Sequence, residues 1–226
     1  MIRFALAAFT LAAVTTSSYA APDLQRVRGN IESANDTSIT VKSADGQTET
    51  IALSPDTKFV SVVKSSLDNV KDGKFIGTAT KGENPPVALE VVIFPESMKG
   101  TGEGHYGWDT IKDTTKSAQG LTKSAMTNGT IKSSSGSSTL TKSAMTNGTV
   151  KAGTSDGGGK KIIVTYDNGK SLDVTVPASA PIVEFEPADK AIVKPGATLF
   201  SVTIKNGDKL NARMVAVGKD GVTPPM

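Results

Sequence analysis

Residues 38–53 read SITVKSADGQTETIAL, and residues 161–176 read KIIVTYDNGKSLDVTV. Both stretches alternate apolar and polar side chains on either side of a two-residue turn, which is Asp45-Gly46 in the first and Asn168-Gly169 in the second. Alternation with a period of two is typical of a half-buried β-strand. Glycine in the turn supplies the positive φ that a tight hairpin requires. Each stretch therefore predicts a β-hairpin.

The two hairpins belong to a longer internal duplication. Six residues recur 123 positions later, Val41, Gly46, Val60, Val70, Lys71 and Gly73 as Val164, Gly169, Val183, Val193, Lys194 and Gly196. The offset is 119 for Gly29, which aligns with Gly148, and 124 for Ala88 and Val91. Short strands separated by turn residues at regular spacing favour a small sandwich or barrel. We therefore expect an all-β protein of two tandem barrels, one per repeat, each with about five or six strands and a helical turn before the last two.

The duplication also sets the expected organisation along the chain. The regions are a signal peptide at residues 1–20, a first barrel repeat at 24–97, a flexible Gly/Ser/Thr-rich linker at 98–143, a second barrel repeat at 144–218 and a C-terminal tail at 219–226.

The order of the motifs resembles a known family. A Gly-x-Ile/Val start, an Ile-x-Val strand, an Asp/Asn-Gly turn, a Lys-x-Gly turn and an alanine-led last strand are similar to the OB-like barrel domain of unknown function found in exported bacterial proteins. The resemblance covers both repeats and implies a fold without an activity, because its motifs are turn glycines and core positions. A metal-transporter permease label on some similar proteins does not fit, since no stretch after residue 20 has the ~20 apolar residues that a spanning helix needs.

The N-terminus predicts export. Arg3 is followed by an apolar run at residues 4–14 and by small residues at Ser18 and Ala20, which is the pattern of a secretory signal cleaved after Ala20. The chain has no cysteine, so neither a lipid anchor on cysteine nor a disulfide is available. We expect a periplasmic or secreted protein without a transmembrane segment in its mature form.

A second, exact repeat lies between the barrel repeats. The segment LTKSAMTNGT at residues 121–130 recurs unchanged at residues 140–149. The second copy runs directly into the second barrel repeat and contains Gly148, so we interpret it as the first strand of that repeat. The first copy is then a spare strand, which we expect to be mobile because a Ser/Gly-rich stretch at residues 133–138 follows it.

Residues 100–109, GTGEGHYGWD, hold the only histidine and the only tryptophan of the chain. One interpretation is a metal site of Glu103, His105 and Asp109, with Met98 as a further candidate, since imidazole and carboxylate groups bind transition metals. Another is a ligand surface of Tyr106 and Trp108, which each combine a flat apolar face with a polar tip. A third is a Gly-rich loop whose aromatic rings pack between the barrels, and composition favours this one.

Composition restricts the function further. The net charge of +3 is too small for a nucleic-acid-binding face. A single histidine gives little support for a nucleophilic triad. We therefore expect a non-enzymatic binding or envelope-structural protein without a cofactor, whose partner is a small molecule or an envelope polymer. The alternatives are a periplasmic metal-binding or metal-delivery protein that uses residues 100–109 and a hydrolase with an unrecognised carboxylate site.

The signal pattern makes a direct prediction. Protein recovered from the cell envelope should begin at Ala21, because signal peptidase cleaves after small residues such as Ala20. N-terminal sequencing of that protein checks the cleavage site. An intact Met1 on protein from the cytoplasm would reject export.

Overall fold

The computed structural model of the chain describes residues 23–115, 120–136 and 159–225. Over these residues the protein is all-β, which confirms the predicted fold class, with thirteen strands and three short 3-10 turns. No helix in this described part of the chain is long and apolar enough to cross a membrane.

The strands follow the predicted order in both repeats. The first repeat gives β1 (Leu24–Ala34), β2 (Ser38–Lys42), β3 (Thr48–Ala52), β4 (Lys58–Lys64), β5 (Phe75–Lys81) and β6 (Val87–Ile93). The expected linker contains β7 (Gly104–Lys112) and β8 (Leu121–Gly136). The second repeat gives β9 (Lys160–Tyr166), β10 (Lys170–Val176), β11 (Ile182–Ala188), β12 (Thr198–Asn206) and β13 (Lys209–Gly218). The 3-10 turns are η1 (Leu67–Asn69), η2 (Glu96–Met98) and η3 (Lys190–Ile192), of which η1 and η3 lie where helical turns were predicted.

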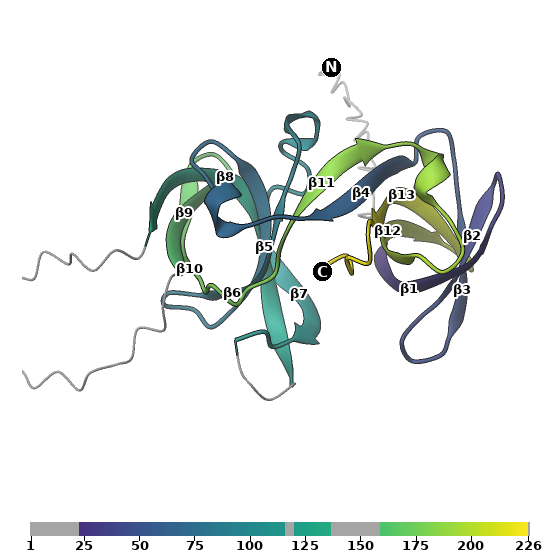
Figure 1. Ribbon diagram of the computed structural model, residues 1–226, viewed down its shortest axis with the longest axis horizontal. Coiled ribbons are helices and arrows are strands. Elements are labelled where there is room, and N and C mark those ends of the chain that lie inside the picture. The colour runs from purple at the N-terminus through teal and green to yellow at the C-terminus, as the bar shows by residue number, and fades with distance from the viewer. Residues whose placement is uncertain (1–22, 116–119, 137–158, 226) are drawn as a thin grey trace, which may run out of the picture.

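All thirteen strands form one continuous hydrogen-bonded sheet, within which two sets of five strands close on themselves (Figure 1). Ring one consists of β1, β2, β3, β13 and β12, and it closes through the parallel pair β3–β13 and the antiparallel pair β1–β12. Ring two consists of β8, β9, β10, β6 and β5, and it closes through the parallel contact between β10 and β6. Strands β4 and β11 pair with each other and connect the two rings.

The prediction of two tandem barrels, one per repeat, is therefore wrong. Each ring takes its first three strands from one repeat and its last two from the other. The chain crosses between the rings along β4 in the first repeat and along β11 in the second, and these strands pair antiparallel from Val183 opposite Lys64 to Ala188 opposite Phe59. The sequence could not show this exchange. Each strand has an equivalent partner strand in both repeats, and its apolar pattern fits either partner equally well.

Matching hydrogen bonds identify the equivalent positions of the two rings. The Gly73 N–H donates to the Ile131 carbonyl at 2.8 Å. The Gly196 N–H donates to the Ile31 carbonyl, also at 2.8 Å. In each case a turn of one repeat binds the first strand of the other repeat, so β8 is the counterpart of β1.

This equivalence corrects the interpretation of the ten-residue repeat. The counterpart of Gly29 is Gly129, not Gly148, because a Cβ at either glycine would collide with a neighbouring backbone carbonyl, that of Lys42 or of Thr165. The first copy is thus the first strand of ring two and not a spare segment. The second copy lies outside the described residues, as does the predicted signal peptide.

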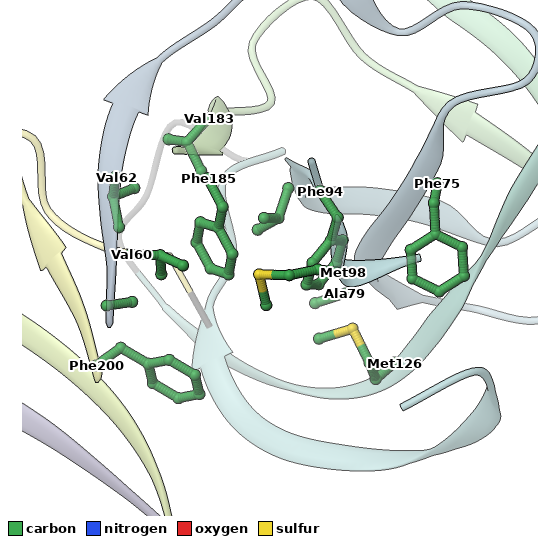
Figure 2. Close-up of a cluster of buried hydrophobic side chains, with 12 residues drawn as sticks. Val60, Val62, Phe75, Ala79, Phe94, Met98, Met126, Val183, Phe185 and Phe200 are labelled. Carbon is green, nitrogen blue, oxygen red and sulfur yellow. The ribbon is translucent and has the colours of Figure 1, made fainter. Parts of the chain in front are cut away.

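Three apolar clusters hold this arrangement together. One fills ring one around Ile39 and Val215, and another fills ring two around Ile76 and Val164. The third lies between the rings and draws on strands of both, with Phe75, Phe94, Phe185, Phe200, Met98 and Met126 as its largest members (Figure 2). Strands such as β6 are buried on both faces, because one face lines a ring and the other faces the shared cluster.

The exchange predicts that the two rings unfold together. Ile39→Ala, in ring one, should cost about 2–5 kcal/mol by leaving a cavity. We expect a single calorimetric transition that moves down as a whole by about 5–15 °C. Thr50→Ala, at an exposed position of β3, is the control and should change the midpoint little. Two resolved transitions, of which only one moves, would contradict the exchange.

Candidate functional site

β7 carries the candidate residues and lies along β8. It pairs antiparallel with β8 from Gly104 opposite Asn128 to Lys112 opposite Leu121, with a bulge between Gly107 and Thr110. The second half of the predicted Gly-rich loop is therefore a strand. Successive side chains of a strand point to opposite faces. His105 and Tyr106 consequently serve two different surfaces.

On one face, His105 forms a polar corner with the neighbouring strands. Its Nδ1 lies 2.8 Å from the hydroxyl oxygen of Thr127 on β8. Its ring centroid is 6.1 Å from that of Tyr166, at the end of β9, with an interplanar angle of 36°. His105 is exposed, whereas Thr127 is fully buried. The imidazole thus lies over the hydroxyl group and beside the phenol ring, with part of its surface open to solvent.

The turn between β9 and β10 brings a carboxylate to the start of β7. The hairpin turn lies where the sequence predicts it but has three residues instead of two, because Tyr166 pairs with Lys170 and Asp167, Asn168 and Gly169 have positive φ values of 40°, 59° and 97°. Both carboxylate oxygens of Asp167 lie 3.6 Å from the position that a Cβ would take at Gly104. The glycine therefore leaves room for this carboxylate beside β7, at the residue that precedes His105. We call His105, Thr127, Tyr166 and Asp167 the His105 corner.

On the other face of β7, two hydrogen bonds fix the hydroxyl group of Tyr106. Its hydroxyl group donates to the Gly102 carbonyl at 3.2 Å, and the Asn128 side-chain amide donates to the Tyr106 oxygen at 3.2 Å. Burial raises the pKa of the Tyr106 hydroxyl, while the Arg26 charge acts in the opposite direction. Tyr106 is 37% exposed, and its ring centroid lies 6.0 Å from that of Trp108.

Trp108 and Asp109 attach β7 to ring one. The Arg26 guanidinium of β1 lies 3.7 Å from the centroid of the Trp108 ring, within cation–π range. Asp109 binds Arg26 at 2.9 Å and Arg28 at 2.8 Å, one through each carboxylate oxygen. Trp108 also packs against the apolar cluster between the rings. Trp108 and Asp109 therefore connect β7, which pairs with ring two, to β1 of ring one.

The structure does not bring the proposed metal ligands together. Both oxygens of Asp109 are occupied by guanidinium groups, and Met98 is buried in the shared cluster. Glu103 lies in an exposed turn closed by its own N–H on the Gly100 carbonyl at 3.3 Å. In the described ranges, no three His, Cys, Asp or Glu side chains gather closely enough to hold a metal ion.

Carboxylates with shifted pKa values do not resemble general acids. A hydrolase that works through a pair of carboxyl groups uses one of them, with a raised pKa, as its general acid. The pKa of Asp36 is lowered chiefly by its hydrogen bond from Lys190, and that of Asp45 by its hydrogen bond from Ser43. The pKa of Asp113 is lowered further still. These three groups stay ionised at neutral pH and act as acceptors in turns and ion pairs.

Comparison with known proteins adds no relative. No protein-family model, no curated protein and no solved structure matches the chain.

Sequence reasoning found His105 but missed its neighbours. Thr127, Tyr166 and Asp167 are separated from it by 22, 61 and 62 positions. The Asn168-Gly169 signal placed Tyr166 and Asp167 at the end of a hairpin, but nothing in the pattern said which turn would lie beside β7. Only the pairing of β8 with both β7 and β9 brings them together.

Asp113, directly after β7, forms a partly buried ion pair with Lys81 of β5, and the pH dependence of this pair can be predicted. Lys81 donates to both oxygens of Asp113, at 2.8 and 2.7 Å, and Thr115 donates to the same carboxylate. Hydrogen bonds from Lys81 and then from Thr115 hold the pKa of Asp113 well below the ordinary value of an aspartate carboxyl. A lowered folded pKa stabilises the protein above the unfolded pKa, and this contribution disappears as the pH falls through the folded pKa.

Asp113→Asn should therefore lower the melting temperature at pH 6. The deficit should shrink as the pH is lowered from about 4 towards 2, because Asp113 then takes up a proton in the unfolded chain and the advantage of its ionised form in the folded parent decreases. Thermal melts at several pH values measure it, and Asp56→Asn, at an exposed turn, is the control. A deficit that stays constant down to pH 2 would contradict this role for the carboxylate.

Proposed function

We propose that this chain is an exported, non-enzymatic binding protein of the cell envelope that holds a polyhydroxylated ligand, such as a glycan chain, at the His105 corner. The observation that carries the proposal is the corner itself. It places the exposed imidazole of His105 next to the Tyr166 ring. The carboxylate of Asp167 lies beside β7, the strand that carries His105.

The chemistry of the corner suits a sugar. A pyranose ring presents an apolar face of C–H groups and an edge of hydroxyl groups. Tyr166 and His105 offer flat surfaces with polar tips for the first, and the Asp167 carboxylate offers an acceptor for the second. Small-molecule sites commonly combine such apolar surfaces with a few placed polar groups. The exposure of His105 leaves this surface accessible to an extended polymer.

The ring geometry is consistent with this class of ligand. We interpret each closed set of five strands as an OB-like barrel, and the two closing pairs β3–β13 and β10–β6 support that interpretation. OB-like barrels commonly bind oligosaccharides or oligonucleotides. The small net charge of +3 makes the oligonucleotide the poorer candidate.

Ring two has the side chains proposed to bind the ligand, and ring one has different residues at the equivalent positions. At the positions equivalent to Tyr166 and Thr127, ring one has Ser43 and Val27, and Val27 belongs to its apolar core. Neither side chain provides an aromatic surface. The proposed function therefore assigns binding to ring two and a supporting role to ring one.

Binding can be measured with purified peptidoglycan in a co-sedimentation assay and with an array of neutral and anionic oligosaccharides. His105→Ala and Tyr166→Ala should each weaken binding about tenfold or more, since a loss of about 1.4 kcal/mol corresponds to a factor of ten. Ser43→Ala, at the matching position of ring one, should bind like the parent. Circular dichroism verifies that each variant is folded.

Two results would reject the proposal. One is the failure of every saccharide to bind the parent protein. The other is full retention of binding in the variant that carries both His105→Ala and Tyr166→Ala, because that variant lacks both flat side chains of the corner.

A further inference from the structure

We infer that the place of β8 in ring two has two alternative occupants within one chain. In the structure the first copy of the ten-residue repeat, residues 121–130, fills it together with the two residues that follow. We propose that residues 140–149, which have the same sequence, can replace them. The inference concerns the fold and does not depend on the proposed function. We call the space between β5, β7 and β9 that residues 121–132 fill the β8 slot.

The β8 slot makes strict demands on its occupant. Met126 and Thr127 are fully buried, and Asn128 is nearly so. The Asn128 amide donates to the Gly102 carbonyl at 3.0 Å as well as to Tyr106. At Gly129, any side chain would collide with the Thr165 carbonyl and with the side chain of Val164. An unrelated segment would therefore fail at several consecutive positions.

Residues 140–149 meet these demands in the required order. Met145, Thr146, Asn147 and Gly148 would take the places of Met126, Thr127, Asn128 and Gly129. The hydroxyl group that contacts His105 would then come from Thr146. All ten residues are identical in the two copies, so the contacts of these positions with β5 and β7 can form with either copy. The interactions of these ten positions consequently give no preference between the two copies.

A preference comes from the residue that follows. Ile131 is fully buried in the core of ring two, and the second copy supplies the smaller Val150 at this position. Exchanging a buried isoleucine for valine removes one methylene, which favours the first copy by roughly fivefold. The first copy is therefore the expected major occupant, as the structure shows.

The connections tolerate the replacement. With the first copy in place, residues 113–120 join β7 to β8, and residues 137–159 join β8 to β9. With the second copy in place, the corresponding connections would be residues 113–139 and 156–159. The entropy of closing a loop depends on the logarithm of its length, so the two arrangements differ by only about a factor of two in population.

Matched glycine variants test the inference by thermal melting. Gly129→Val blocks the first copy, so the second should take over and the melting temperature should fall by less than about 5 °C. Gly148→Val blocks the minor occupant and should change almost nothing. The double variant leaves no fitting occupant and should lose more than about 10 °C or fail to fold. If Gly129→Val alone is as damaging as the double variant, the inference is wrong.

Cysteine reactivity shows which copy is buried, because the chain has no cysteine of its own. Thr127→Cys should be protected from thiol reagents in the otherwise unchanged protein, and Thr146→Cys should react readily. In the Gly129→Val background, labelling at Thr146→Cys should slow at least about tenfold in the monomer. Continued fast labelling would overturn the inference, and so would protection found only in a dimer, since the segment would then come from a second copy of the chain.

A deletion provides a test that does not depend on strain at a glycine. Removal of residues 121–139 joins Gly120 to the second copy and keeps the backbone hydrogen bond from the Asp113 N–H to the Gly120 carbonyl, 2.7 Å long. Both connections of the new strand are then short. The shortened protein should fold and melt within about 5 °C of the parent. Failure of this variant to fold would overturn the inference.

Discussion

The antiparallel pairing of β4 with β11 is the constraint on which the rest of this structure depends. Each of these strands carries its repeat out of one ring and into the other. Once they are paired, the last two strands of a repeat cannot return to the ring that holds its first three. The turn glycines Gly73 and Gly196 then bind the first strand of the opposite repeat. A duplicated sequence thus folds as one interlocked unit rather than as two independent domains.

The interlocked arrangement explains how a chain without cysteine is held together. Each ring alone would have a small core, and domains of this size are only marginally stable. The exchange adds a third cluster between the rings, in which Phe94 contacts Phe75 and Phe185 edge to face at 5.5 and 5.3 Å (Figure 2). The ion pairs of Asp109 with Arg26 and Arg28 add charged contacts at the rim of this cluster. Stability therefore comes from the contact between the rings as much as from either ring.

The two rings share many backbone and hydroxyl contacts but differ in the strand and side chains that form the candidate site. Backbone and hydroxyl contacts repeat from ring to ring: Thr78 donates to the Glu90 carbonyl in ring two, and Ser201 donates to the Met214 carbonyl in ring one. β7 has no counterpart among the described residues of the first repeat, and it brings His105 to ring two alone. The candidate site is thus an addition to one copy of a duplicated scaffold, and the other copy serves as its support.

Local sequence determined the strands, the turns at Gly46 and Gly169, and the apolar faces, because the period of two and the need for positive φ are properties of neighbouring residues. It also singled out His105. Tertiary structure alone decided which repeat completes which ring, which ten-residue copy becomes β8, that Tyr166 lies beside His105, and that Asp167 lies near Gly104. These outcomes depend on pairing between distant strands, and a duplicated sequence offers two nearly identical partners for each pairing. Local pattern cannot distinguish such partners, so only the packing of the whole chain selects one.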